Sequence, residues 1–220
     1  MRLALFDLDN TLLAGDSDYE WGQFMCDQGV VDRAAYEAQN RKYYEQYKAG
    51  TLDIHEFLGF ALRPLANHTA TELERWHAQF MRARILPMIT PAARTLVRRH
   101  LQAGELCAVI TATNSFVTAP IAREFGIEHL IATEPERRNG RFTGRVAGTP
   151  CFRDGKLVRL DEWLAGLGRR LADFEASTCY SDSHNDLALL ERMTRPVAVD
   201  PDETLAREAA RRGWERISLR

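Results

Sequence analysis

The chain has 220 residues and a mass of 25.0 kDa, and 45% of its residues are hydrophobic and 27% charged. Its 29 basic and 31 acidic side chains nearly balance, so it lacks the basic excess that is typical of proteins that bind nucleic acid. The first apolar run, Leu3–Phe6, is too short for a signal peptide or a membrane span. We therefore expect a soluble cytoplasmic protein with no nucleic-acid or membrane partner. The sequence leaves the oligomeric state open.

The four cysteines are scattered singly along the chain: Cys26, Cys107, Cys151 and Cys179. They form no C-x-x-C pair and have no histidine at the spacing of metal ligands. This pattern argues against both a disulfide framework and a zinc site.

The run Leu3–Phe6 predicts a buried strand, and residues 16–86 after it contain several helix signals but no convincing strand. We therefore predict an inserted domain of three or four helices. Its capping boxes are expected to begin at Ser17, Asp53 and Thr69, and its stops are Gly50 and Pro64. Its aromatic residues are expected mostly to form a small core of their own: Trp21, Phe24, Tyr43, Tyr44, Tyr47, Phe57, Phe60 and Trp76.

Helices and strands alternate in the rest of the chain. The elements predicted in chain order are the helix Thr90–Leu101, the strand Leu106–Ile110, the helix Ser115–Phe125, a hairpin at Arg137–Phe142, the strands Ala176–Tyr180 and Val197–Val199, and the helix Asp202–Arg211. The signals for them are Pro91 at a first helical position, Asn139-Gly140 as a turn, and a D-x-x-E capping box from Asp200 to Glu203. Such alternation predicts an α/β fold, with a parallel sheet covered by helices on both faces.

Two carboxylates, Asp7 and Asp9, follow the first predicted strand directly. Side chains two residues apart in a strand point to the same side, and ligands of α/β proteins bind at the carboxyl ends of the strands. Like charges placed there repel each other unless a cation neutralises them. The alternative, a polar surface turn, would explain either residue alone better than it explains the pair.

A second acidic segment, Asp182 to Asp186, follows the strand Ala176–Tyr180. Mg²⁺ prefers oxygen ligands and commonly takes one or two carboxylates together with phosphate oxygens. Asp7, Asp9 and Asp182 are therefore candidate ligands of Mg²⁺, with Asp186 beside them. The alternative is that Asp182 and Asp186 cap the start of a helix.

Two further signals are weak when taken alone. Thr111 and Ala112 directly follow the predicted strand Leu106–Ile110 and precede a helix. A hydroxyl and free backbone N–H groups at this point would hold a phosphate. Lys156 also lies near the start of a helix.

Taken together and in this order, the four elements resemble the four motifs of the haloacid dehalogenase superfamily of phosphohydrolases, in the branch that contains phosphoserine phosphatase. The resemblance implies a Rossmann-like three-layer core, formed by residues 1–15 and 87–220, and a helical cap over residues 16–86. It implies a magnesium-dependent phosphatase that hydrolyses a small phosphorylated metabolite through an aspartyl-phosphate intermediate. The implied roles are nucleophile for Asp7, acid and base for Asp9, phosphate binding for Thr111, Lys156 and Asn185, and metal binding for Asp182 with support from Asp186.

The departures from the family pattern concern the substrate. Phosphoserine phosphatases carry a glutamate just after the first motif and an arginine in the cap, and here Asp16 and Ala61 stand at those positions. Asp16 is therefore a candidate substrate-binding residue, and Arg63 lies close enough in sequence to replace the arginine. We expect phosphoserine to be a poor substrate.

Two alternative functions remain open at this point. A phosphotransferase or mutase of the same superfamily would use another hydroxyl in place of water. A receiver-like signalling domain also combines acidic residues, Mg²⁺, a hydroxyl and a lysine, but it has no cap and generally carries its phosphate acceptor on a middle strand.

Overall fold

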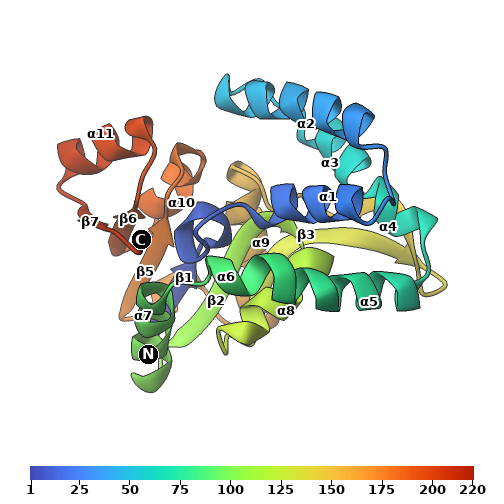
Figure 1. Ribbon diagram of the computed structural model, residues 1–220. Coiled ribbons are helices and arrows are strands. Elements are labelled where there is room, and N and C mark those ends of the chain that lie inside the picture. Colours follow the sequence, from blue (N-terminus) through green and yellow to red (C-terminus); the bar gives the residue numbers. More distant parts are fainter.

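The computed structural model describes the chain from residue 1 to 220, apart from the side chain of Lys48. Within these residues, a sheet with strand order β4-β3-β2-β1-β5-β6-β7 forms the centre of the molecule (Figure 1). The strands are β1 (Arg2–Phe6), β2 (Leu106–Asn114), β3 (His129–Arg138), β4 (Arg141–Ala147), β5 (Ala176–Ser181), β6 (Arg195–Val199) and β7 (Glu215–Ile217). All neighbouring pairs are parallel except β3 and β4.

Helices cover both faces of the sheet. The helices are α1 (Ser17–Asp27), α2 (Arg33–Lys48), α3 (Ile54–Ala61), α4 (Arg63–Asn67), α5 (Ala70–Phe80), α6 (Leu86–Met88), α7 (Pro91–Gln102), α8 (Ser115–Glu124), α9 (Asp154–Gly166), α10 (Leu187–Glu191) and α11 (Glu203–Arg212). Alternate residues of β1 face opposite sides, because Ala4 and Phe6 join one hydrophobic core and Leu3 and Leu5 join the other. The first core includes residues of α7 and α8, and the second includes residues of α9, α10 and α11. This three-layer arrangement confirms the predicted fold class.

The four predicted strands and the hairpin are confirmed. The hairpin turns at Asn139 and Gly140, whose φ angles of 50° and 77° are those that a tight two-residue turn requires. The parallel part of β3 and the whole of β7 were not predicted from the sequence. The parallel part of β3 covers only His129 to Thr133, and β7 is a short polar edge strand, so neither shows a clear strand pattern.

Several helix starts differ from the predicted ones. The N-cap of α1 is Asp16, which accepts a hydrogen bond from the Tyr19 N–H, whereas Ser17 is the first helical residue. The N-cap of α11 is Asp202, so the predicted capping box from Asp200 is wrong. By contrast, the predicted capping box at Thr69 is confirmed, and Asp53 caps α3. Pro64 lies in the first turn of α4 and therefore starts a helix as well as following one.

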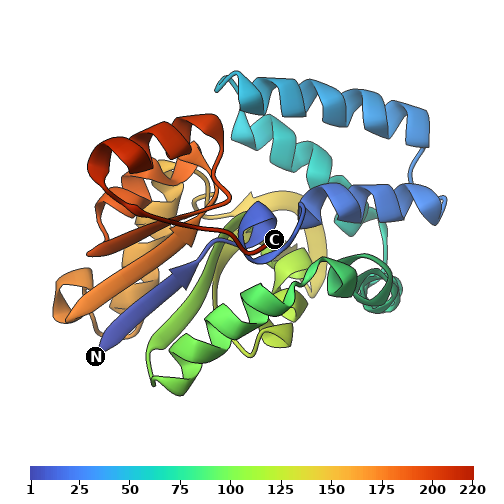
Figure 2. The same ribbon diagram turned by 60° about the vertical axis from the view of Figure 1, so that its left-hand side comes forward.

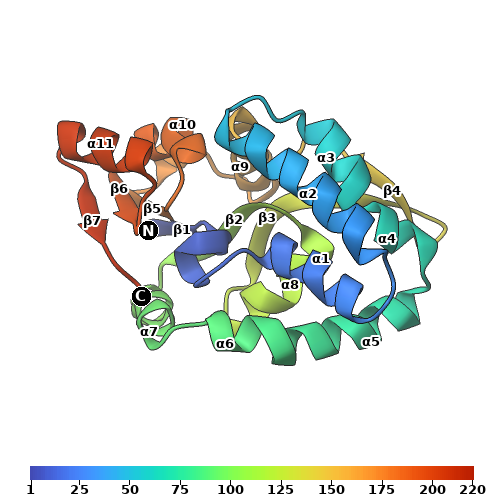
Figure 3. The same cartoon turned by 45° about the horizontal axis from the view of Figure 1, so that its top comes forward.

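Residues 17–80 form the helices α1 to α5 between β1 and β2, and Figure 3 shows α2 and α3 side by side beyond α1. Their aromatic residues do not form a single core. Tyr43 packs against Phe57 and Phe60, whereas Trp21 packs against Phe80 and, across the boundary with α8, against Phe116. The position of the domain boundary stays a prediction.

Two further observations concern the chain as a whole. No helix among the described residues is long and apolar enough to span a membrane. The four cysteines are buried and have free thiols in the described structure.

Candidate active site

Asp7 lies at the carboxyl end of β1, the central strand of the sheet. Phe6 pairs with Val109 of β2 on one side and with Tyr180 of β5 on the other, so the ends of three strands meet here. The Asp7 N–H extends this ladder by donating to the Tyr180 carbonyl at 2.9 Å. The chain then turns sharply over Leu8–Leu12, with Asn10 at a left-handed φ of 56°. This turn separates Asp7 from Asp9.

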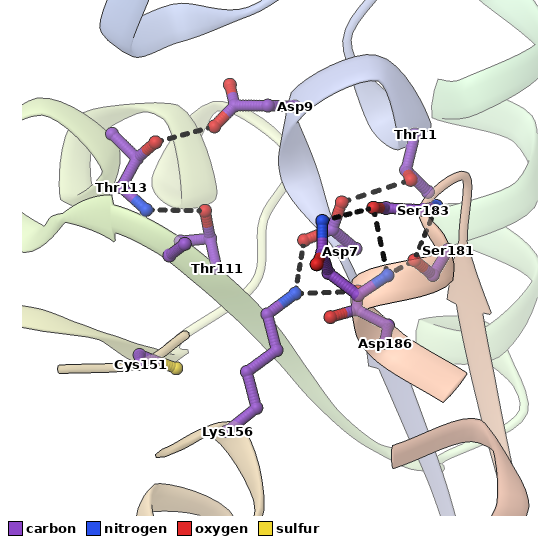
Figure 4. Close-up of polar contacts among 12 residues, drawn as sticks. Asp7, Asp9, Thr11, Thr111, Thr113, Cys151, Lys156, Ser181, Ser183 and Asp186 are labelled. Atoms are coloured by element: carbon purple, nitrogen blue, oxygen red, sulfur yellow. Dashed lines mark hydrogen bonds and ion pairs between the residues drawn. The ribbon is translucent and has the colours of Figure 1, made fainter. Parts of the chain in front are cut away.

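Lys156 joins two buried carboxylates. Its ammonium group donates to Asp7 Oδ1 at 2.8 Å and to Asp186 Oδ2 at 2.7 Å (Figure 4). Burial by itself lowers the pKa of a lysine, but here Asp186 and Asp7 outweigh it and hold the pKa of Lys156 well above its usual range. Burial raises the pKa of Asp7 to about 6, although Lys156 opposes the shift. Lys156 therefore remains a cation beside Asp7.

The backbone before Lys156 explains why this side chain reaches the site. A Cβ atom on Gly155 would lie 2.0 Å from the Pro150 carbonyl oxygen, so only glycine allows this close approach. Arg153, which precedes the helix α9, has a φ of 51°. The tight turn places Lys156 in the first turn of α9, with its side chain directed into the core.

Thr11 links the first acidic segment to the second. Its hydroxyl lies 3.2 Å from Asp7 Oδ2 and 3.0 Å from Asp182 Oδ1, and it accepts the Asp182 N–H at 3.0 Å. Burial, followed by the charge of Asp7, raises the pKa of Asp182 to about 8. Burial therefore disfavours the ionised form of both carboxyl groups, and their mutual repulsion adds to the shift at Asp182.

Asp9 faces a different set of partners, away from Lys156 (Figure 4). Its Oδ1 atom accepts the Ser17 N–H at 2.6 Å, and its Oδ2 atom accepts the Thr113 hydroxyl at 2.7 Å. Burial, followed by the charge of Asp16, raises the pKa of Asp9 to about 6. This pKa suits a group that both donates and accepts protons near neutral pH.

The four predicted metal ligands do not form one cluster. Among the described residues, no three histidine, cysteine, aspartate or glutamate side chains lie together as a metal site. Asp7 and Asp182 share Thr11, whereas Asp186 accepts hydrogen bonds from Lys156 and from the Ser181 hydroxyl. The metal-binding roles of Asp7, Asp9, Asp182 and Asp186 all stay predictions.

Thr111, Ala112 and Asn185, which are predicted to bind phosphate, lie near the carboxyl ends of β2 and β5. Thr111 is buried near the end of β2, and its hydroxyl accepts the Thr113 N–H at 3.2 Å. The carbonyl of Ala112 accepts the Thr133 hydroxyl at 2.7 Å. Asn185 follows β5 and accepts a hydrogen bond from Arg153 Nε at 2.9 Å. Their contacts with a phosphate stay predictions.

Several polar residues of the site were not predicted from the sequence. Thr11 and Thr113 contact catalytic candidates directly, and the closeness of Thr11 to Asp7 in sequence is a signal that could have identified Thr11. Arg153 and Tyr47 were missed because their partners are distant in sequence. Tyr47 lies on α2, and its hydroxyl is 3.1 Å from that of Ser183 after β5.

A separate acidic group lies where α1 begins. Asp16 is exposed and caps the helix, and Asp18 is half-buried. Burial, followed by the charges of Asp16 and Asp9, raises the pKa of Asp18 to about 8. No hydrogen-bond or ion-pair partner of the Asp18 carboxylate is found among the side chains that the structure describes. This end of α1 therefore holds two carboxyl groups with no cationic partner among the described side chains, and a bound cation would favour their ionised forms.

The two positions considered for recognition of a substrate carboxylate, Ala61 and Arg63, lie apart from the catalytic candidates. Ala61 is buried at the end of α3. Arg63 lines a cavity of about 600 Å³ between α2 and the α3–α4 segment, together with Tyr36 and Phe60. None of the catalytic candidates lines this cavity.

Comparisons with known proteins agree with this geometry. The sequence model of the haloacid dehalogenase-like hydrolases matches residues 4–191. A histidinol-phosphatase from Neisseria meningitidis serogroup C (strain 8013) is 45% identical over 220 residues, which cover 100% of this chain and 99% of that protein. A protein of unknown function from Bordetella pertussis Tohama I has a crystal structure with a TM-score of 0.95 and 53% identity, covering 100% of this chain and 99% of that one. A substrate-bound phosphoserine phosphatase shares the fold, with a TM-score of 0.67 and 19% identity over 94% of this chain and 89% of that one.

Proposed function

Because this chain belongs to the haloacid dehalogenase-like hydrolases, in the branch that resembles phosphoserine phosphatase, and is a phosphatase acting on a phosphomonoester, we propose that it uses Mg²⁺ and an aspartyl-phosphate intermediate. We further propose that its substrate is a small phosphomonoester whose leaving group carries a positive charge. The observation that carries the proposed chemistry is Asp7 at the end of β1, with Lys156 Nζ 2.8 Å from one oxygen and the Thr11 hydroxyl 3.2 Å from the other.

In the first step, an oxygen of Asp7 attacks the phosphorus atom as the bond from phosphorus to the leaving oxygen breaks. Asp9 donates a proton to this leaving oxygen, and an alcohol departs. In the second step, Asp9 accepts a proton from water, and the water oxygen attacks phosphorus. The bond from phosphorus to Asp7 breaks, so inorganic phosphate leaves and Asp7 is restored. Lys156 offsets the charge of the phosphoryl oxygens throughout.

The donor atoms fit Mg²⁺. Asp7 and Asp182 supply two carboxyl groups that share the Thr11 hydroxyl, and burial raises the pKa of both, so a bound cation would stabilise their ionised forms. These two residues would hold the ion. Lys156, which also contacts Asp186, donates a hydrogen bond to Asp7 Oδ1. When bound, Mg²⁺ supplies positive charge that draws the phosphate toward Asp7. We expect chelation to abolish activity and Mg²⁺ to restore it, whereas Ca²⁺ restores it poorly because its coordination is larger and looser.

Two features support a cationic leaving group. Asp16 and Asp18 place two carboxyl groups without a cationic partner beside Asp9, and a positively charged leaving group would favour their ionised forms. The position that carries an arginine in phosphoserine phosphatases is the buried Ala61, so a substrate carboxylate lacks its usual partner. The relative from Neisseria meningitidis that is similar over the full chain is a histidinol-phosphatase. We therefore propose histidinol phosphate, which has an amine and an imidazole but no carboxylate, as the first substrate to test.

The test is a comparison of kcat/KM for histidinol phosphate, phosphoserine and glycerol phosphate, all with Mg²⁺. We expect histidinol phosphate to be preferred by at least about tenfold, which corresponds to about 1.4 kcal/mol of transition-state binding. A preference for phosphoserine would contradict the proposed substrate class. Absence of activity on all three, in folded protein with Mg²⁺, would contradict the proposed function itself.

A further inference from the structure

The final residues of the chain contact the turn that carries the catalytic candidates. From β7, the segment crosses the molecule and ends beside the turn Leu8–Leu12 (Figure 2). The Arg220 guanidinium donates to the Asn10 carbonyl at 2.5 Å and to the Leu13 carbonyl at 3.0 Å. A third and longer contact reaches the Thr11 carbonyl at 3.5 Å. One side chain therefore binds the backbone between Asp9 and the end of the turn.

This turn needs an external partner for its shape. Asn10 has a left-handed φ of 56° inside it, and Asp9 has an extended conformation, so the carbonyl groups do not follow a regular helix. Carbonyl groups without helical partners require other donors. The planar guanidinium has several donors in a fixed arrangement, which an ammonium group lacks. Its Nε atom also lies 3.9 Å from Asp200 Oδ2.

The segment before Arg220 is anchored on both sides. Leu219 is buried in a hydrophobic core, and its N–H donates to Asp200 Oδ2 at 3.0 Å. The Leu219 carbonyl accepts the hydroxyl of Thr90, the N-cap of α7, at 2.7 Å. These contacts reduce the freedom that Arg220 would lose on binding the turn, so its position is defined by the fold.

We propose that Arg220 is a positioning residue for phosphate-ester hydrolysis, because it holds the turn that orients Asp7 and Asp9. This inference rests on the proposed function for the roles of these two aspartates. Small displacements of reacting groups reduce rates strongly, by about 100-fold for a shift of about 1 Å. The loss of Arg220 should therefore lower kcat more than it changes KM.

The experiment compares Arg220→Ala and Arg220→Lys with the wild type on one phosphomonoester with Mg²⁺, together with thermal unfolding of each protein. We expect Arg220→Ala to lower kcat by about 10- to 100-fold with little change in KM. Arg220→Lys should recover only part of the rate. Guanidinium ion added at millimolar concentration should raise the kcat of Arg220→Ala but not that of the wild type.

The matched control is Arg216→Ala, which removes an exposed arginine from β7 in the same segment. It should keep the wild-type kcat. If both Arg220 variants fold and keep the wild-type kcat, the inference is wrong, whatever happens to their unfolding temperature. If Arg220→Ala does not fold, a wild-type kcat in Arg220→Lys overturns the inference as well. Inactivity of the wild type on every phosphomonoester would instead contradict the proposed function, and the inference would fall with it.

Discussion

The carboxylates at the end of the sheet and those at the start of α1 differ in how the protein compensates them. Asp7, Asp9 and Asp186 each accept hydrogen bonds from side chains or backbone groups of other elements. Asp18 has no such partner among the described side chains, although Asp16 and Asp9 lie close enough to raise its pKa. The first region is therefore organised before any ligand binds. The second lacks such partners, so its carboxyl groups would be held in the ionised form only by a cationic ligand. This difference separates the reaction from the choice of substrate.

The largest expected effect is in the first region. Replacing Asp7 with Asn keeps the shape of the side chain but removes the nucleophile, so kcat should fall by more than about 10⁴-fold. Steady-state kinetics with circular dichroism, to verify the fold, checks this expectation. A folded Asp7→Asn variant with wild-type turnover would show that the nucleophile is another group.

Asp9 should contribute less than Asp7, because its proposed role is proton transfer. The Asp9→Asn variant should lose about 10²- to 10⁴-fold in kcat on an alkyl phosphate, whose leaving oxygen needs a proton. The loss should be smaller on 4-nitrophenyl phosphate, whose leaving group departs readily as an anion. Equal losses on both substrates would argue against the role of general acid.

Asp18 tests the second region. Replacing Asp18 with Asn should raise KM for histidinol phosphate by about tenfold, equivalent to about 1.4 kcal/mol, and leave 4-nitrophenyl phosphate almost unaffected. The matched control is Glu74→Gln, which removes an exposed carboxylate from α5. If Asp18→Asn raises KM equally for both substrates, the carboxyl group of Asp18 does not select a cationic substrate.

The smallest expected effect concerns the contact between the helices and the sheet domain. His77 of α5 is buried, and its Nε2 atom lies 2.9 Å from the Val117 carbonyl of α8, to which the neutral ring donates. Burial lowers the pKa of His77 below 6.5, so the unfolded chain takes up this proton at a higher pH than the folded one. The free energy of unfolding should therefore fall as the pH drops from about 6.5 towards the lowered pKa, by at most about 1.4 kcal/mol per pH unit.

Urea unfolding at several pH values measures this slope. The His77→Gln variant should lose this part of the pH dependence, whereas His55→Gln, at an exposed position on α3, should retain it. Identical slopes in all three proteins would show that His77 does not contribute. Activity at neutral pH should change little in His77→Gln, since the residue lies in a packing contact.

The two regions also differ in how far the sequence predicts them. Asp7, Asp9, Asp182 and Lys156 could be found because each stands in a short motif beside a predicted strand or helix. In the structure Lys156 contacts Asp7, and Thr11 links Asp7 to Asp182. Thr113 and Arg220 could not be found in this way, since their partners are more than 100 residues away. The capping box at Thr69 was predicted from local pattern alone, whereas the N-cap Asp16 was not, because Ser17 begins an equally good pattern. Local signals predict the candidate reacting groups, and tertiary contacts determine which residues hold them.

A direct test of the central claim is chemical trapping of the phosphorylated residue. Sodium borohydride reduces an acyl phosphate to an alcohol, so an enzyme quenched during turnover should contain homoserine in place of an aspartate. Peptide mass spectrometry identifies the position. The account predicts homoserine at Asp7, only when both substrate and Mg²⁺ are present, and none in the Asp7→Asn variant. Rapid turnover with no reduction at Asp7, or with reduction at a different carboxylate, would contradict it.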